Sequence, residues 1–251
     1  MRTKAIVFDF DGTLSKPNKM PNSWMRIWEK LDKLDEDKKF YEMYKNGVIN
    51  YEEWGELVVK AYREYGCNKT LLKEVANDTE LLDDTEQVIK ELGEKGIKIF
   101  VLSGGIKNII DYKLENVKEY VTNVEAQEIL LDENECVESI TKLNHLVEDK
   151  SEYVFYILNK YHLIPQEVLF VGNSDNDEDV YKTGVKTLCI NPLEADYKNK
   201  VLWNNYIKKS NSLRDIMQFV EMWKIMLKLM NFVWLKILKK IYSLWRCNAK
   251  A

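Results

Sequence analysis

KAIVFDFDGT, residues 4–13, joins an apolar, β-prone run to two carboxylates that stand two residues apart. Strand alternation points Asp9 and Asp11 to the same side of the chain. Like charges this close repel each other, and burying them is costly unless a cation or a proton compensates. Gly12 then lets the chain turn sharply. The arrangement therefore indicates a metal-assisted reaction better than it indicates a structural role.

The composition is that of a globular protein. The chain has 251 residues, of which 45% are hydrophobic, enough for one large domain or for a core with an inserted subdomain. The formal net charge of −4 gives no general nucleic-acid signal, so we expect no nucleic-acid partner. Only two histidines are present, which argues against a histidine-rich metal site and favours hard-cation chemistry through carboxylates.

The cysteine pattern predicts a cytoplasmic protein with free thiols. The four cysteines are scattered, with no CxxC pair, and we identify no secretory leader.

Strands alternate with helices along most of the chain. We expect helices over 84–93, 106–117 and 150–162, and short strands or loops near 120–124, 129–131 and 137–140. Long crossovers between strands predict a parallel sheet covered on both faces, that is, a Rossmann-like three-layer α/β core. The expected strands are 5–8, 97–102 (closed by Ser103-Gly104-Gly105), 168–171, 186–190 and, less distinctly, 206–207.

A small all-helical cap is predicted after the first strand. Residues 15–77 show helical periodicity and no comparable buried strand, and Asn50 with Glu53 matches a capping box. The predicted division is a core of residues 1–14 and 78–220, a cap of residues 15–77, and a basic amphipathic helix over 221–251. A second capping box is expected at Ser212-Leu213-Arg214-Asp215.

Four groups of polar residues follow strands or begin helices. Because parallel strands end at one edge of a sheet, we expect these groups to meet there. They are Asp9 with Asp11, Ser103-Gly104-Gly105, Lys150, and the run GNSDND at 172–177.

This ordered set resembles the haloacid dehalogenase-like hydrolase superfamily, from about residue 4 to about residue 219. It is most similar to the phosphoserine phosphatase-like branch, because of the SGG run at 103–105 and the helical insert. The resemblance implies a Mg²⁺-dependent phosphatase that hydrolyses a small phosphorylated metabolite through an aspartyl phosphate.

The resemblance also assigns roles that phosphoryl transfer requires. Asp9 is expected to be the nucleophile and Asp11 the general acid/base. Ser103, with the backbone amides of Gly104-Gly105, is expected to hold phosphate oxygens. Lys150 is expected to neutralise the nucleophile and the phosphate.

The expected Mg²⁺ ligands are Asp9, Asp11, Asn173 and Asp177. The family commonly has an aspartate where this chain has Asn173, so the site should bind Mg²⁺ more weakly unless another group, such as Asp175, compensates.

The substrate stays open at this point. Arg26, Arg63 and Lys19 of the cap, and Asn176 of the core, are candidates to contact an anionic substrate. Phosphoserine recognition in the family uses an acidic residue shortly after the first motif, but residues 15–23 contain none. This argues against phosphoserine as the substrate unless Glu29 or Glu42 substitutes for that residue.

Two other functions compete with the phosphatase. A phosphotransferase or phosphomutase would use the same residues and pass the phosphoryl group to a second hydroxyl. The other alternative is a non-catalytic binding protein with the same fold, and Asn173 is the only residue that supports it.

The end of the chain is strongly basic. Residues 221–251 carry seven basic residues and one acidic residue, a charge of +6, which leaves −10 on residues 1–220. The longest charge-free run there has seven residues, too few to span a membrane. Residues 222–246 could dock on their own domain, form a homo-oligomer interface, or lie on an anionic membrane surface as a peripheral contact.

Overall fold

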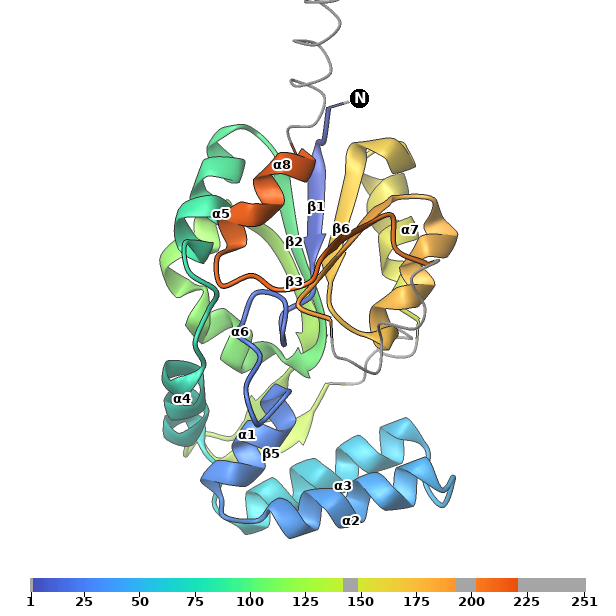
Figure 1. The fold of residues 1–251 in the computed structure, drawn as a ribbon. Coiled ribbons are helices and arrows are strands. Elements are labelled where there is room, and N and C mark those ends of the chain that lie inside the picture. The colour runs from blue at the N-terminus through green and yellow to red at the C-terminus, as the bar shows by residue number, and fades with distance from the viewer. Residues whose placement is uncertain (1, 142–148, 193–201, 221–251) are drawn as a thin grey trace, which may run out of the picture.

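A computed structural model describes residues 2–141, 149–192 and 202–220. Its centre is a six-stranded parallel sheet in the order β3-β2-β1-β6-β7-β8, which confirms the predicted α/β class (Figure 1). The strands are β1 (Ala5–Phe8), β2 (Lys98–Ile106), β3 (Val121–Gln127), β6 (Val168–Gly172), β7 (Lys186–Ile190) and β8 (Asn205–Ile207).

Strand β1 is apolar at every position because both of its faces are covered. Ile6 and Phe8 pack in one cluster, which includes apolar side chains of α5 (Thr85–Glu94). Ala5 and Val7 pack in another cluster, with α7 (Ser151–Lys160). All four side chains are fully buried. A strand buried on both faces reads as a continuous apolar run, which is why residues 5–8 show no polar alternation.

The remaining core helices complete the two outer layers. Figure 1 shows α5 and α8 on one side of the sheet and α7 on the other. The other helical segments of the core are α6 (Lys107–Lys113), α8 (Met217–Val220), and the 3₁₀ segments η1 (Glu115–Tyr120), η2 (Pro165–Glu167), η3 (Asp175–Thr183) and η5 (Leu213–Ile216).

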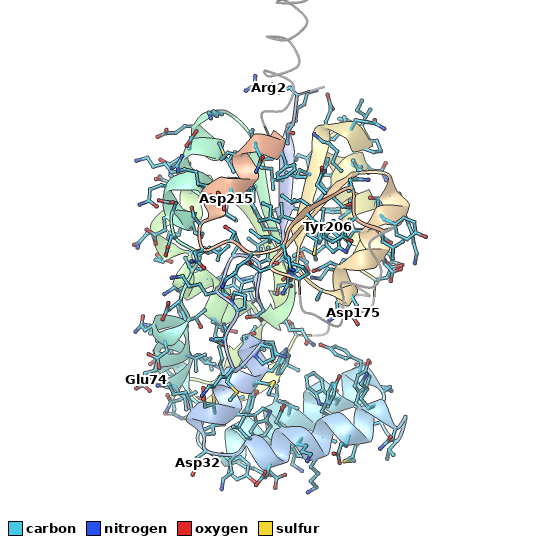
Figure 2. The ribbon with its side chains drawn as sticks, viewed as in Figure 1. Arg2, Asp32, Glu74, Asp175, Tyr206 and Asp215 are labelled. Atoms are coloured by element: carbon cyan, nitrogen blue, oxygen red, sulfur yellow. The ribbon has the colours of Figure 1, made fainter. Side chains whose placement is uncertain are left out.

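Four helices lie between β1 and α5, at the carboxyl end of the sheet (Figures 1 and 2). They are α1 (Ser23–Lys30), α2 (Leu34–Lys45), α3 (Tyr51–Glu64) and α4 (Lys69–Asp78). The capping box of α3 is confirmed, because Asn50 Oδ1 accepts from Glu53 N and Glu53 Oε2 accepts from Asn50 N. We call residues 17–78 the insert.

The apolar core of the insert is not made by helices alone. A two-stranded antiparallel hairpin, β4 (Ile129–Leu131) and β5 (Val137–Ile140), follows β3 in the chain. Ile129 and Val137 are buried in the same cluster as Trp28 and Tyr62 of the insert. The expectation of an all-helical cap is therefore incomplete, because this hairpin from the core sequence covers part of the insert's apolar surface.

Two linkers, residues 14–16 and 79–82, attach the insert to the core. They run side by side, since Lys16 N donates to Glu80 O and Leu82 N donates to Leu14 O, each at 2.8 Å. The chain therefore leaves the core and returns to it at one place.

Two local predictions are wrong. Strand β2 does not end at Leu102 but continues through residues 103–105 to Ile106, where it pairs with Gln127 of β3 after a shift of register. Ser212 caps a 3₁₀ turn by accepting from Arg214 N, while Asp215 accepts from Ser210 Oγ, so the expected capping box does not form.

The basic segment predicted over 221–251 lies outside the described residues. Within the described ranges, no helix is both long enough and apolar enough to cross a membrane.

Candidate active site

Three neighbouring strands bring the predicted site residues to one edge of the sheet. In register, Phe8 of β1 lies between Val101 of β2 and Val171 of β6. Asp9 N donates to Val171 O at 2.8 Å, which continues the pairing of β1 with β6 by one residue. The polar residues that follow these strands therefore converge where the insert lies.

A buried lysine joins the first and last of these groups. Lys150 Nζ lies 2.8 Å from Asp9 Oδ1 and 2.5 Å from Asp177 Oδ1. Lys150 is only 3% exposed, and Asp9 and Asp177 are buried as well. Removing three charges from water is costly, and the two ion pairs offset that cost. The structure thus brings together three residues that lie far apart in the sequence.

The ionisation of this cluster follows from burial and pairing. Burial raises the pKa of Asp9 to about 7, against the opposing effect of Lys150. Burial lowers the pKa of Lys150, but Asp177 and Asp9 outweigh it, so the pKa is raised overall. Lys150 therefore stays positively charged at neutral pH, which its expected role beside Asp9 requires.

Asp177 has both of its carboxylate oxygens engaged. Oδ1 takes the ion pair with Lys150, and Oδ2 accepts from the backbone N–H groups of Asn173 (3.0 Å) and Ser174 (3.2 Å). A Cβ added to Gly172 would lie 2.4 Å from that Oδ2, so only glycine leaves room for this contact. Asp177 is thereby fixed as the residue that positions Lys150.

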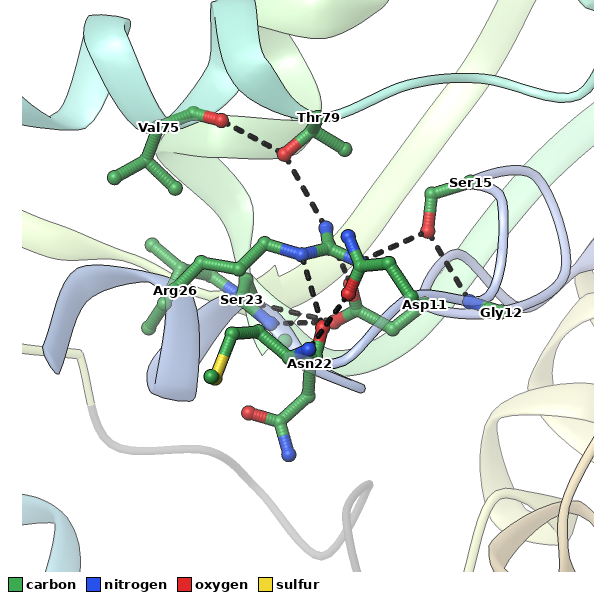
Figure 3. A network of polar contacts seen from close by, with 12 residues as sticks. Asp11, Gly12, Ser15, Asn22, Ser23, Arg26, Val75 and Thr79 are labelled. Atoms are coloured by element: carbon green, nitrogen blue, oxygen red, sulfur yellow. Dashed lines mark hydrogen bonds and ion pairs between the residues drawn. The ribbon is translucent and has the colours of Figure 1, made fainter. Parts of the chain in front are cut away.

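Asp11 is held by different residues, all in the insert (Figure 3). Its Oδ2 accepts from Ser23 N at 3.0 Å and from Ser23 Oγ at 3.1 Å. Its Oδ1 lies 3.1 Å from Nη1 of Arg26. Burial raises the pKa of Asp11, while Arg26 and Ser23 act in the opposite direction. The two carboxylates of the opening motif therefore occupy separate environments.

The SGG run of residues 103–105 packs directly against Asp11. A Cβ added to Gly105 would lie 2.6 Å from Asp11 Oδ2 and 2.5 Å from Ser23 Oγ. Ser103 is buried, and its Oγ accepts from Gly105 N at 3.1 Å. This bond engages one of the two glycine amides that were predicted to hold phosphate. The insert also reaches this run, because Trp24 Nε1 donates to Gly104 O at 2.9 Å.

A family model for haloacid dehalogenase-like hydrolases matches residues 3–180, which is more than half of the chain. The chain belongs to this family. No curated protein matches its sequence.

Solved structures of phosphoserine phosphatases share the fold of this hydrolase. One, a phospho-aspartyl intermediate analogue of phosphoserine phosphatase, has a TM-score of 0.68 at 19% identity and covers 88% of this chain and 100% of its own. A substrate-bound phosphoserine phosphatase gives the same TM-score and identity, with 88% and 99% covered. A probable phosphoserine phosphatase from Vibrio cholerae has a TM-score of 0.70 at 14% identity, with 86% and 64% covered.

Asn173 brings an amide group against the DFDGT turn, which also carries Asp9. Asn173 is buried, and a Cβ added to Gly12 would lie 2.2 Å from its Nδ2, so the Asn173 amide rests on the DFDGT turn. Gly12 has φ +81°, a conformation that glycine adopts without strain. Among the described residues, no group of three or more His, Cys, Asp or Glu side chains could hold a metal. Asp9 and the Asn173 amide offer oxygen donors of the type that Mg²⁺ prefers, but they supply little negative charge.

The four residues predicted to contact substrate have different positions in this hydrolase, and Lys19 is exposed in the segment that precedes α1. Asn176 is exposed in η3, next to Asp175, which Figure 2 shows at the end of the core that faces the insert. Arg63 is exposed in the last turn of α3. Arg26 is buried with its guanidinium on Asp11, which does not favour direct contact with substrate.

Sequence reasoning did not identify Ser23 or Thr79 as part of the site. Ser23 follows the Asn22 cap of α1, and its Oγ also accepts from Ile106 N at 2.8 Å. Thr79 is the C-cap of α4 and accepts from Arg26 Nη1 at 3.2 Å. The only local signal is the N-cap pattern at Asn22-Ser23, which marks a helix start and does not show what the helix contacts.

Proposed function

We propose that this hydrolase is a phosphatase that cleaves a small phosphomonoester through an aspartyl phosphate on Asp9. The observation that carries the proposal is the buried Lys150, which pairs with Asp9 and is itself fixed by Asp177. Structural lysines are seldom fully buried, whereas phosphoryl transfer needs a fixed cation beside the nucleophile. A phosphoserine phosphatase with the same fold is described as a phospho-aspartyl intermediate analogue, which supports the covalent route.

The first step transfers the phosphoryl group to the protein. A carboxylate oxygen of Asp9 attacks phosphorus, and the bond from phosphorus to the leaving oxygen breaks. Asp11 in its protonated form gives its proton to that oxygen, so the alcohol leaves neutral. The raised pKa of Asp11, caused by burial, suits a carboxyl that must hold a proton before the step.

The second step regenerates the protein. Asp11, now ionised, accepts a proton from water, and the water oxygen attacks phosphorus. The bond between phosphorus and Asp9 breaks, and inorganic phosphate leaves. Lys150 balances negative charge beside Asp9 in both steps, since its pKa is raised by its two carboxylate partners.

Asp9 and Asn173 would hold Mg²⁺ beside this nucleophile, whereas Asp11 is a weak ligand because its carboxyl is held by Ser23 and Arg26 and must carry a proton in the first step. The bound cation would supply positive charge to the phosphoryl oxygens. Asp177 is a weak ligand as well, because both of its oxygens already have partners.

A screen of phosphorylated metabolites with Mg²⁺ tests the proposal and identifies the substrate. Phosphate release by the wild type, lost in Asp9→Asn and kept in Asp111→Asn, is the expected result. Asp111 is a partly exposed carboxylate on α6 that pairs with Lys107, so its variant controls for the loss of one acid. Release by Asp9→Asn at the wild-type rate would contradict the mechanism. Phosphate passed to a second alcohol without release would favour a phosphotransferase instead.

A further inference from the structure

Arg26 occupies the junction between the insert, the two linkers and Asp11. It projects from α1, and only 6% of it is exposed. Figure 3 shows its guanidinium between Asp11, Ser15 and Thr79. Ser15 belongs to the first linker and Thr79 to the second.

Three neutral contacts set the plane of this guanidinium. Nε donates to Met20 O at 3.2 Å, Nη1 donates to Thr79 Oγ1 at 3.2 Å, and Nη2 donates to Ser15 Oγ at 3.4 Å. The guanidinium is a rigid planar fork, so contacts on three of its nitrogens fix both its position and its orientation. Its place beside Asp11 is therefore determined by the way the insert is attached to the core.

The two oxygens of Asp11 are treated differently. Oδ2 already accepts two hydrogen bonds from Ser23. Oδ1 is buried 3.1 Å from Arg26 Nη1, yet no group in the described chain has the direction to donate a hydrogen bond to it. The Arg26 contact is thus an ion pair that holds Oδ1 in place without occupying it as a hydrogen-bond acceptor. Oδ1 is therefore the Asp11 oxygen that no described residue occupies as a hydrogen-bond acceptor.

We propose that Arg26 is a positioning residue that orients Oδ1 of Asp11 toward the leaving oxygen. Because Arg26 is held by both linkers, this orientation depends on how the insert packs on the core. The inference rests on the proposed function, because it assigns Asp11 as the acid. It gives Arg26 a role different from substrate contact.

A second ion pair joins the same helices and provides a matched control. Lys30 of α1 lies 2.7 Å from Asp78, which ends α4 immediately before Thr79. Both side chains are more than a third exposed, so the pair holds α1 to α4 without reaching Asp11. Lys30→Gln removes an attachment between the same two helices and leaves the Asp11 contact intact.

Substrates with different leaving groups distinguish a loss of Asp11 orientation from a general loss of activity. Release of p-nitrophenolate needs little help from an acid, whereas release of the alkoxide of glycerol 2-phosphate needs a proton. The ratio kcat/KM reports only the steps up to the first irreversible one, here the release of the alcohol. For Arg26→Gln we expect a loss of about 100-fold in kcat/KM on glycerol 2-phosphate and of about threefold or less on p-nitrophenyl phosphate. Arg26→Lys should recover part of the loss, and Lys30→Gln should stay within about twofold of wild type on both substrates.

Thr79→Val tests the dependence on the linkers. Valine keeps the shape of threonine and removes the oxygen that accepts from Nη1, so the guanidinium loses one anchor while Asp11 loses nothing directly. We expect a smaller loss than in Arg26→Gln, again larger on the alkyl phosphate. Equal losses on the two substrates in the Arg26 and Thr79 variants, or a leaving-group effect in Lys30→Gln, would overturn the proposal.

A double-mutant cycle on unfolding tests the contact without any activity. The effect of Arg26→Lys on the unfolding equilibrium constant should differ by at least about fivefold between the wild-type and Asp11→Asn backgrounds, whereas Lys30→Gln should be additive with Asp11→Asn. Additive Arg26 and Asp11 substitutions would overturn the proposal. A wild-type protein without phosphatase activity would contradict the proposed function, and this cycle would still decide the Arg26 contact.

Discussion

The two carboxylates of the DFDGT turn differ in what holds them. Asp9 is paired with Lys150, which is fixed by Asp177, and all three belong to the core. Asp11 is bonded to Ser23 and paired with Arg26, and both of these belong to α1 of the insert. The proposed nucleophile is therefore fixed by the sheet and its helices, while the proposed acid is fixed by the insert that covers it. Substitutions in the core and in the insert should damage different steps.

The largest effect is expected for Lys150→Met. Removing this lysine leaves Asp9 and Asp177 as unpaired buried carboxylates, which costs about 3–5 kcal/mol of unfolding free energy, and it removes the cation beside the nucleophile. We expect phosphatase activity to fall by about 10³-fold or more on alkyl and aryl phosphates alike. Urea unfolding and phosphate release measure the two effects.

Lys160→Met is the control for Lys150→Met. Lys160 ends α7, the helix that Lys150 immediately precedes, and donates to Tyr156 OH at the surface. Activity near the wild-type value in Lys160→Met is required for the comparison. A Lys150→Met protein with more than a tenth of wild-type activity would contradict the role of the core cluster.

Ser23→Ala should weaken the contacts through which the insert holds Asp11. It removes the hydroxyl that donates to Asp11 Oδ2 and accepts from Ile106 N, which leaves a buried N–H without this acceptor. We expect about 1–3 kcal/mol of destabilisation and a loss in kcat/KM of about tenfold, larger for alkyl than for aryl phosphates. Ser139→Ala, at an exposed position of β5, serves as the control. An unchanged leaving-group ratio would show that Ser23 does not orient the acid.

Asn173→Asp should strengthen cation binding in the core by adding the negative charge that the amide lacks. A carboxylate in place of the amide strengthens a hard-cation site, so we expect the Mg²⁺ concentration for half-maximal activity to fall by about tenfold. Magnesium titrations of the two proteins measure it. The same half-saturation concentration in both would show that residue 173 is not a ligand.

A further effect concerns the pH dependence of stability without divalent cations. Burial disfavours the charged form of Asp9 and raises its pKa from the ordinary value of 3.8 to about 7 in the folded protein. The folded state binds more protons between these values, so this group makes the unfolding free energy fall as pH rises from about 4 to about 7. Asp9→Asn should remove that part of the slope. Urea unfolding of both proteins at several pH values in EDTA measures it, and parallel curves would contradict the raised pKa.

The core could be predicted from the sequence because its signals are local and repeated. The apolar run of residues 5–8 follows from burial on both faces, and parallel strands deliver Asp9 and residues 172–177 to one edge. The extension of β2 through residues 103–105 was not predicted, because glycines usually indicate a turn and here they permit close contact with Asp11.

The insert side could not be predicted because it depends on how helices dock. Arg26 and Asp11 meet only after α1 and α4 are seated on the paired linkers, and no local pattern encodes that orientation. A cap arginine suggested substrate contact, and its burial on Asp11 became visible only in three dimensions. Likewise, Ile129 and Val137 fill the insert's core from a hairpin far along the chain.

Trapping the phosphorylated protein tests the central claim most directly. The wild type is mixed with p-nitrophenyl phosphate and Mg²⁺, quenched in acid within milliseconds, and analysed by peptide mass spectrometry. A phosphoryl group on the carboxylate of Asp9, absent from Asp9→Asn and longer-lived in Asp11→Asn, is the predicted result. Phosphate release by the wild type with no label on Asp9, or with label on another residue, would contradict the account.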